Sequence, residues 1–210
     1  MLDTILRDKY IVKKVVKRIL KILLVVLTLF FLTLTGFYIW LNQRLDKVVN
    51  KETYQSLVEE IRTSQELPPQ FYNIYGQVTG YKDNSTTNRF LFYNILRILM
   101  NKNGRPYCPC VDVNYGMVYK TLDTWTVGLA LDRDVSPRKC LDFYLNNYDF
   151  SFPVKGVSDA SNFYYKKRIE QLTDDEILEL SVMTLNPSYY NKNRNPENLN
   201  KKVLEIKEKK

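Results

Sequence analysis

The 210-residue sequence predicts a mainly α-helical protein with one transmembrane helix near its N-terminus. Three observations predict this class. An uncharged apolar run long enough to cross a bilayer lies near the start of the chain, the apolar residues that follow recur mostly with helical spacing, and strand-like alternation is scarce. With 45% hydrophobic and 26% charged residues, the composition fits one folded unit beyond the apolar run.

The net charge of +8 is concentrated at the two ends of the chain. Residues 1–21 carry seven basic against two acidic residues, and residues 201–210 carry five against two, so the middle is close to neutral. We therefore expect no nucleic-acid partner. The sequence also has no histidine, which excludes Ser/His and Cys/His nucleophile pairs and the commonest metal ligand. No metal site is expected from the residue pattern.

A membrane-spanning helix is predicted over residues 22–41, which are uncharged and almost wholly apolar. As a helix rising about 1.5 Å per residue, this run covers roughly the 30 Å of a bilayer's hydrocarbon core. Tyr38 and Trp40 suit the membrane interface, and the basic segment 1–21 predicts a cytoplasmic N-terminus by the positive-inside rule. The rest of the chain is then expected on the outer side.

This apolar run has two alternative interpretations, a cleaved signal peptide and a buried helix. A cleaved signal peptide would have an apolar core of about 7–15 residues ending in small residues of A-x-A type, and no alanine precedes Ala130. A cytoplasmic protein with a buried helix is the second alternative. An uncleaved signal anchor fits the length and composition best.

Residues 42–66 are expected to form an exposed, charged stalk helix with Leu57, Val58 and Ile61 at helical spacing. A folded domain is expected over residues 67–210. Three of its helix starts carry local signals, namely Pro68–Pro69, the capping box of Thr173 and Glu176 before a helix over 174–185, and Pro196 within a helix over 195–209.

Five motifs in the C-terminal third recur in the order and spacing of one enzyme family. They are Leu141–Tyr144–Leu145–Asn146, Gly156–Ala160–Tyr164–Tyr165, Leu172–Thr173–Glu176, Pro187–Tyr190–Asn191 and Val203–Leu204. This set resembles S-K-x-x-I-L-x-x-Y-L-N, G-x-x-x-A-x-x-Y-F, L-T-x-x-E, P-x-x-Y-N-P and the terminal V-L of the family 51 peptidoglycan glycosyltransferases. The resemblance covers residues 66–208 with a weak middle. It implies a lysozyme-like fold, polymerisation of lipid II and the layout of a monofunctional biosynthetic transglycosylase.

The family's reaction needs a carboxylate base and a second acidic residue. Without gaps, the family motif E-D-x-x-F-x-x-H-x-G falls on Thr79–Gly80, so the first carboxylate is missing. Asp83 is a stand-in only if the loop is rebuilt, and a solvated turn residue is the alternative. The motif R-K-x-x-E falls on residues 120–124, where the acid is offset by one residue as Asp123. On a helix this offset is a rotation of about 100°.

The resemblance also implies groups that bind the substrate. Lys120 retains a cation of R-K-x-x-E, and Arg138 and Lys139 flank the position where Pro137 replaces the lysine of S-K-x-x-I-L. Asn146 completes the Y-L-N match. A divalent metal, Mg or Mn, is implied only if the chain is active. The tyrosines of the motifs are expected to be core and groove-wall residues, although a carbohydrate-binding groove would use the same residue type.

Cys108, Cys110 and Cys140 lie in the part expected outside the membrane, where disulfides persist. A bond from Cys108 or Cys110 to Cys140 is expected. The alternatives are three reduced thiols, or zinc bound by the three cysteines, which the spacing favours least.

Taken together, these patterns predict a single-pass protein of the bacterial inner membrane with a periplasmic, transglycosylase-like domain of cell-wall synthesis. Lipid II polymerisation is one hypothesis, with activity left open by the missing and displaced carboxylates. The second is a pseudoenzyme that serves as a structural or docking subunit of a cell-envelope complex, and a membrane-anchored adaptor is the third. The expected partners are the lipid membrane, lipid II or a glycan strand, and an envelope protein.

Overall fold

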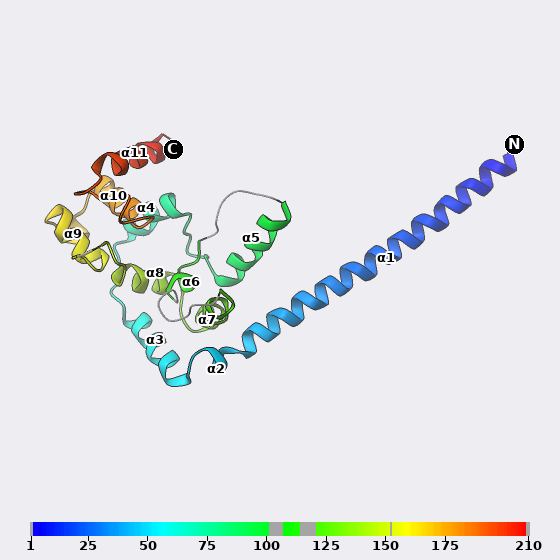
Figure 1. Ribbon diagram of the computed structural model, residues 1–210, viewed down its shortest axis with the longest axis horizontal. Coiled ribbons are helices and arrows are strands. Elements are labelled where there is room, and N and C mark those ends of the chain that lie inside the picture. The colour runs from blue at the N-terminus through cyan, green and yellow to red at the C-terminus, as the bar shows by residue number, and fades with distance from the viewer. Residues whose placement is uncertain (1, 101–106, 114–120, 152, 209–210) are drawn as a thin grey trace. The chain divides into compact units, whose positions relative to one another are not determined.

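The computed structural model describes residues 2–100, 107–113, 121–151 and 153–208 (Figure 1). It divides into two compact units, Met1–Arg44 and Leu45–Lys210. The helices are, in chain order, α1 (Leu2–Gln43), α2 (Leu45–Val48), α3 (Lys51–Thr63), α4 (Pro69–Thr79), α5 (Thr87–Met100), α6 (Pro109–Asp112), α7 (Thr121–Asp134), α8 (Pro137–Asn146), α9 (Val157–Tyr165), the short 3-10 helix η2 (Ile169–Gln171), α10 (Asp174–Met183) and α11 (Pro196–Lys207).

The predicted mainly helical class is confirmed. Within the described residues there is no sheet, and the only extended pairing is a single antiparallel bridge between Asp149 and Lys155. Gly156 follows this bridge with a φ of 87°, a backbone conformation that glycine adopts without strain. The turn therefore leads directly into α9.

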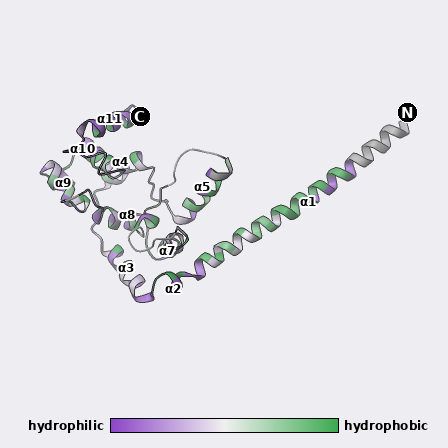
Figure 2. Cartoon of the chain, viewed as in Figure 1, coloured by the Kyte–Doolittle hydropathy of each residue, from purple (hydrophilic) through white to green (hydrophobic). Residues whose placement is uncertain are grey.

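The first unit is the single helix α1. Its segment Lys13–Gln43 has 31 residues and a mean hydropathy of 2.5, so it is long and apolar enough to cross a membrane. Figure 2 shows hydrophobic residues along most of this stretch. Trp40 lies near its end with the Arg44 guanidinium 4.8 Å from the ring centroid. By length and composition the helix fits a membrane anchor or a signal sequence, and it contains the predicted span 22–41.

The expected stalk is not an exposed rod. It forms two helices separated at Asn50, whose side chain accepts a hydrogen bond of 2.7 Å from the Thr53 N–H and thereby starts α3. One face of α3 is buried in the second unit through Tyr54, Leu57 and Ile61. The helical spacing of Leu57, Val58 and Ile61 is confirmed. The same spacing occurs in an exposed helix and in one that packs against a core, so it did not predict burial.

All three local helix signals are confirmed. Pro69 occupies the first turn of α4, and Pro196 occupies the first turn of α11. Before α10, the Thr173 hydroxyl accepts from the Glu176 N–H, while the Glu176 carboxylate accepts from the Thr173 N–H at 2.8 Å. These helix starts follow from local chemistry and need no distant partner.

The second unit has two hydrophobic clusters that meet at α8, which lies between them in Figure 1. The larger cluster joins α4, α8, α9, α10 and α11, and its fully buried residues include Phe71, Leu141 and Leu180. The smaller cluster joins α3, α6, α7 and α8 around Ile61 and Leu131. Since α8 contributes buried side chains to both, it links the two clusters.

Candidate functional site

The end of α4 is where the family resemblance places its first carboxylate. Thr79 donates its hydroxyl to the Tyr75 carbonyl at 2.8 Å and accepts from the Tyr81 N–H at 3.2 Å. Gly80 has a φ of 79° and donates its N–H to the Gly76 carbonyl at 2.8 Å. These two residues terminate the helix and present no acidic group.

Asp83 lies in the exposed turn after α4. Its Oδ1 accepts a hydrogen bond from the Tyr81 hydroxyl at 3.0 Å and lies 3.7 Å from the Arg138 Nε. The Arg138 guanidinium in turn lies over the Tyr72 ring, 4.1 Å from its centroid. The carboxylate is therefore held against α8 by a cation and is open to solvent.

Asp123 lies elsewhere, in the first turn of α7. Three pockets formed by described residues, of about 430, 530 and 630 Å³, are lined by neither Asp83 nor Asp123. Lys120, the cation expected beside them, lies outside the described residues. The pair of converging acids that would favour catalysis is thus not formed by these two side chains in the described pockets.

The remaining predicted binding residues hold the α3–α4 connection to α8. The Lys139 ammonium donates to the Ser64 carbonyl at 3.1 Å and pairs with the Glu66 carboxylate at 3.0 Å. The Asn146 amide donates to the Gln65 carbonyl at 2.8 Å. These contacts satisfy carbonyls at the end of α3 and give Lys139 and Asn146 a structural role, while Asn146 also lines the 430 Å³ pocket.

Sequence reasoning missed Asp142, a fully buried carboxylate on α8. It accepts from the Tyr72 hydroxyl at 2.6 Å and from the Leu67 N–H at 3.3 Å, whereas its Oδ2 has no hydrogen-bond partner among the described residues. Burial raises the pKa of Asp142. An acidic residue between the apolar Leu141 and Phe143 was the available signal.

A second missed carboxylate, Asp112 at the end of α6, lies beside a group of tyrosines. The hydroxyls of Tyr75 and Tyr107 are 3.0 Å apart, and their rings meet edge to face at 5.8 Å. Burial raises the pKa of Asp112 to about 7, against a hydrogen bond from Tyr107 that lowers it. A carboxyl whose pKa is raised in this way exchanges its proton closer to neutral pH than an exposed aspartate does.

Asp132 on α7 serves the start of α5. Its carboxylate accepts from the Thr87 N–H at 2.7 Å and from the Thr87 hydroxyl at 3.2 Å. Gly128, one turn earlier, allows this approach, because a Cβ there would lie 2.9 Å from the Thr87 hydroxyl oxygen. Asp132 thus caps the start of α5.

One of the two expected disulfide pairings is present. Cys110 and Cys140 are bonded, with their Cα atoms 5.1 Å apart, and the bond joins α6 to α8. Cys108 is a buried free thiol 3.6 Å from the Thr87 hydroxyl, and burial raises its pKa to about 12, which disfavours the thiolate. A disulfide of this kind persists in an oxidising compartment.

A metal site requires several donor side chains close together. In the part of the chain that the structure describes, no three Cys, Asp or Glu side chains gather closely enough to hold a metal ion. The divalent metal implied by the family resemblance therefore has no ligand set among these residues.

Comparison with known proteins places a relationship in the C-terminal half. Residues 116–209 match the transglycosylase family model. A biosynthetic peptidoglycan transglycosylase of Acinetobacter baylyi is 32% identical over 76 residues, which are 36% of this chain and 32% of that protein. One from Acinetobacter baumannii is 31% identical over 80 residues, 38% and 34% of the two chains. Penicillin-binding protein 1F of Bacillus subtilis is 34% identical over 71 residues, 34% and 10% of the two chains.

The aligned stretch spans about a third of the length of the biosynthetic transglycosylases from Acinetobacter. The family match over residues 116–209 includes α7 to α11, whereas α4 and Asp83 lie outside it. The helices that carry the five sequence motifs therefore lie in the stretch that matches the transglycosylase family model and is similar to biosynthetic peptidoglycan transglycosylases.

Proposed function

From the transglycosylase-family domain at residues 116–209, we propose that this chain is a membrane-anchored envelope protein that uses a transglycosylase-type fold without polymerising lipid II by itself. It acts as a docking subunit of the complexes that assemble peptidoglycan in the bacterial inner membrane. Its N-terminus is cytoplasmic and the unit Leu45–Lys210 is periplasmic.

One observation carries this proposal. Thr79 and Gly80, where the sequence resemblance places the family's first carboxylate, form the C-terminal cap of α4 and supply no base. A glycosyl transfer needs a group that removes the proton from the acceptor hydroxyl. Neither a threonine hydroxyl bound to a carbonyl nor a glycine does this at neutral pH.

The neighbouring charges support the same conclusion. Asp83 pairs with Arg138, and Lys139 pairs with Glu66. These side chains hold α8 against the segments that precede it, so two of the predicted phosphate-binding cations already have protein acceptors. An arrangement of this kind conserves the shape of the domain and weakens its catalytic machinery.

The proposed orientation of the chain in the membrane is supported by α1 and by the disulfide. The apolar helix fits the thickness of a bilayer, and the basic residues at its N-terminal side favour the cytoplasm. The bond between Cys110 and Cys140 fits a periplasmic environment.

A lipid II polymerisation assay tests the catalytic part. The full chain in detergent is supplied with lipid II and Mg or Mn, with the Acinetobacter baylyi transglycosylase as a positive control. We expect no glycan polymer from the chain. Polymer that disappears in Asp112→Asn, Asp83→Asn or Asp123→Asn, but persists in the exposed control Asp174→Asn, would establish an enzyme and overturn the proposal.

Isolation in mild detergent tests the docking part. We expect the chain to co-purify with proteins of peptidoglycan synthesis, and the association to survive when lipid II is absent. A strictly monomeric particle, isolated under conditions that preserve other envelope complexes, would contradict a subunit role.

A further inference from the structure

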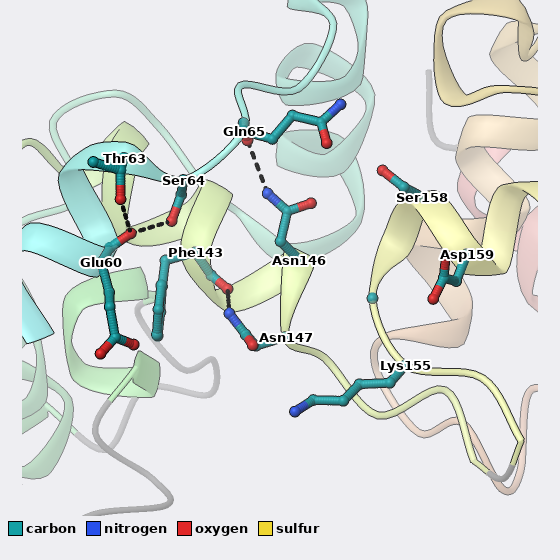
Figure 3. A pocket seen from close by; sticks show the side chains of 11 residues that line it. Glu60, Thr63, Ser64, Gln65, Phe143, Asn146, Asn147, Lys155, Ser158 and Asp159 are labelled. Atoms are coloured by element: carbon teal, nitrogen blue, oxygen red, sulfur yellow. Dashed lines mark hydrogen bonds between the residues drawn. The ribbon is translucent and has the colours of Figure 1, made fainter.

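Two adjoining pockets run between α3 and α8, away from the carboxylate positions discussed above. The first has a volume of about 430 Å³ and is shown in Figure 3. The second has a volume of about 530 Å³ and lies against α3. Both are lined by Glu60 and Phe143, so the two pockets adjoin, and we call them together the α3–α8 groove.

The first pocket offers hydrogen-bond donors and acceptors on facing walls. In Figure 3, Asn146 and Asn147 at the end of α8 face Ser158 and Asp159 at the start of α9, and the Lys155 side chain extends between them. Amide and ammonium groups donate, whereas carboxylate and amide oxygens accept. A ligand that both donates and accepts at several positions, as a sugar hydroxyl does, matches this lining.

The charge of the pocket argues against an anion. Two carboxylates, Glu60 and Asp159, face a single ammonium, Lys155. The carbonyl ends of α3 and α8 also point their negative dipoles here, opposed only by the start of α9. A neutral, polyhydroxylated ligand avoids the repulsion that a phosphate or a free carboxylate would meet.

An unsatisfied hydroxyl lies in the wall of the same pocket. The Ser158 Oγ is buried and has no hydrogen-bond partner among the described residues. A polar group buried without a partner costs about 1–3 kcal/mol. The N-terminus of α9 adds free backbone donors, since no side chain caps it.

The second pocket continues the groove with a mixed lining. Phe143 is partly buried and forms part of the wall common to both pockets. The negative face of an aromatic ring attracts the C–H groups on the apolar face of a pyranose. Beyond it, α3 contributes the hydroxyls of Thr53 and Ser56 and the carboxylate of Glu52. Polar groups around an aromatic wall suit a second sugar ring.

We propose that the α3–α8 groove binds a neutral oligosaccharide, with one ring in each pocket. The ring in the first pocket exchanges hydrogen bonds with Asp159, Lys155 and the Asn146 side chain, and the next ring lies against Phe143 and α3. This site is separate from the end of α4, so it operates whether or not the domain transfers sugars.

Calorimetric titration of the full chain in detergent tests this assignment. The probes are N-acetylglucosamine and its β-1,4-linked dimer and tetramer, which carry no lipid or pyrophosphate and so report nothing on polymerisation. We expect the dimer to bind more tightly than the monosaccharide, because it reaches both pockets. Failure of all three to bind at millimolar concentration would overturn the proposal.

Variants locate the binding. Asp159→Asn and Lys155→Ala remove exposed groups of the first pocket, and each is expected to weaken the dimer about tenfold, the loss of one charge-assisted hydrogen bond. Asp174→Asn and Lys201→Ala are the matched controls, exposed residues outside the groove that should leave binding unchanged. Asp174 shares with Asp159 a place in the first turn of a helix.

Two further outcomes count against the assignment. Affinity that is equal in the groove variants and in the controls, with all variants melting like wild type, would place the sugar elsewhere. N-acetylmuramic acid carries a carboxylate. If it binds more tightly than N-acetylglucosamine, and if Lys155→Ala abolishes this difference, the pocket selects an anion and the proposal of a neutral ligand is overturned.

Discussion

Breaking the bond between Cys110 and Cys140 should destabilise the second unit by a predictable amount. The bond closes a loop of 30 residues between α6 and α8, within the smaller hydrophobic cluster. In the chain-entropy model a loop of this length contributes about 3.7 kcal/mol by restricting the unfolded chain. For a domain of this size, that loss lowers the melting temperature by about 7–15 °C.

The measurement compares oxidised and reduced protein in a Cys108→Ala background. Cys108 lies two residues from Cys110, and removing it prevents the free thiol from exchanging with the bond. Thermal unfolding of the full chain in detergent is followed by circular dichroism, with and without reductant. The triple variant that also carries Cys110→Ala and Cys140→Ala should melt near the reduced form.

The reasoning fails if reduction moves the melting temperature by less than about 2 °C, well below the loop-entropy value. Such a result would mean that the packing of α6 against α8 holds the loop as firmly without the bond. The triple variant has no thiols, so a change in its melting temperature when reductant is added would reveal an effect of the reductant on the detergent or the anchor.

Two other predictions concern single side chains. The folded-state pKa of Asp112 is about 7, above its ordinary 3.8, so the folded protein holds a proton that the unfolded chain releases. Stability should therefore fall as the pH rises from about 4 to 7 and level off above that, and Asp112→Asn should reduce the slope and add about 2–4 kcal/mol at pH 8. Melting temperatures of wild type and variant across this range check it, and parallel curves would contradict it. Gly156→Ala combines a φ of 87° with a Cβ 2.5 Å from the Asn146 carbonyl oxygen, whereas Gly80→Ala at φ 79° meets no atom within 4 Å. The first should cost about 2–3 kcal/mol and the second about 1 kcal/mol, as measured by urea unfolding, and equal costs would show that the close contact is relieved.

Helix starts were predictable because the interactions that make them are local. The capping box of Thr173 and Glu176 spans three residues, and proline favours the first helical turn through its own ring. The apolar span 22–41 was predictable because the thickness of a bilayer sets a minimum length. None of these features requires knowledge of what lies far away along the chain.

The site could be predicted only in part, because its contacts join distant residues. Arg138 meets Asp83, and Lys139 meets the Ser64 carbonyl, across 55 and 75 positions. The sequence suggested that these cations bind substrate, and the spacing alone offered no way to see that protein acceptors face them. Asp112 was missed for the same reason, since its raised pKa comes from burial beside tyrosines of other segments.

By itself, the sequence determined the helical class, the membrane-length apolar helix and the family to which the motifs of α8 to α11 are related. Periodicity, capping chemistry and motif spacing are written along the chain. Tertiary structure alone decided that the expected stalk is buried, which cysteine pairs with Cys140, and that the carboxylates are dispersed among caps and ion pairs. Those outcomes depend on which surfaces exclude water from one another, and helices of the same pattern are able to pack in more than one way.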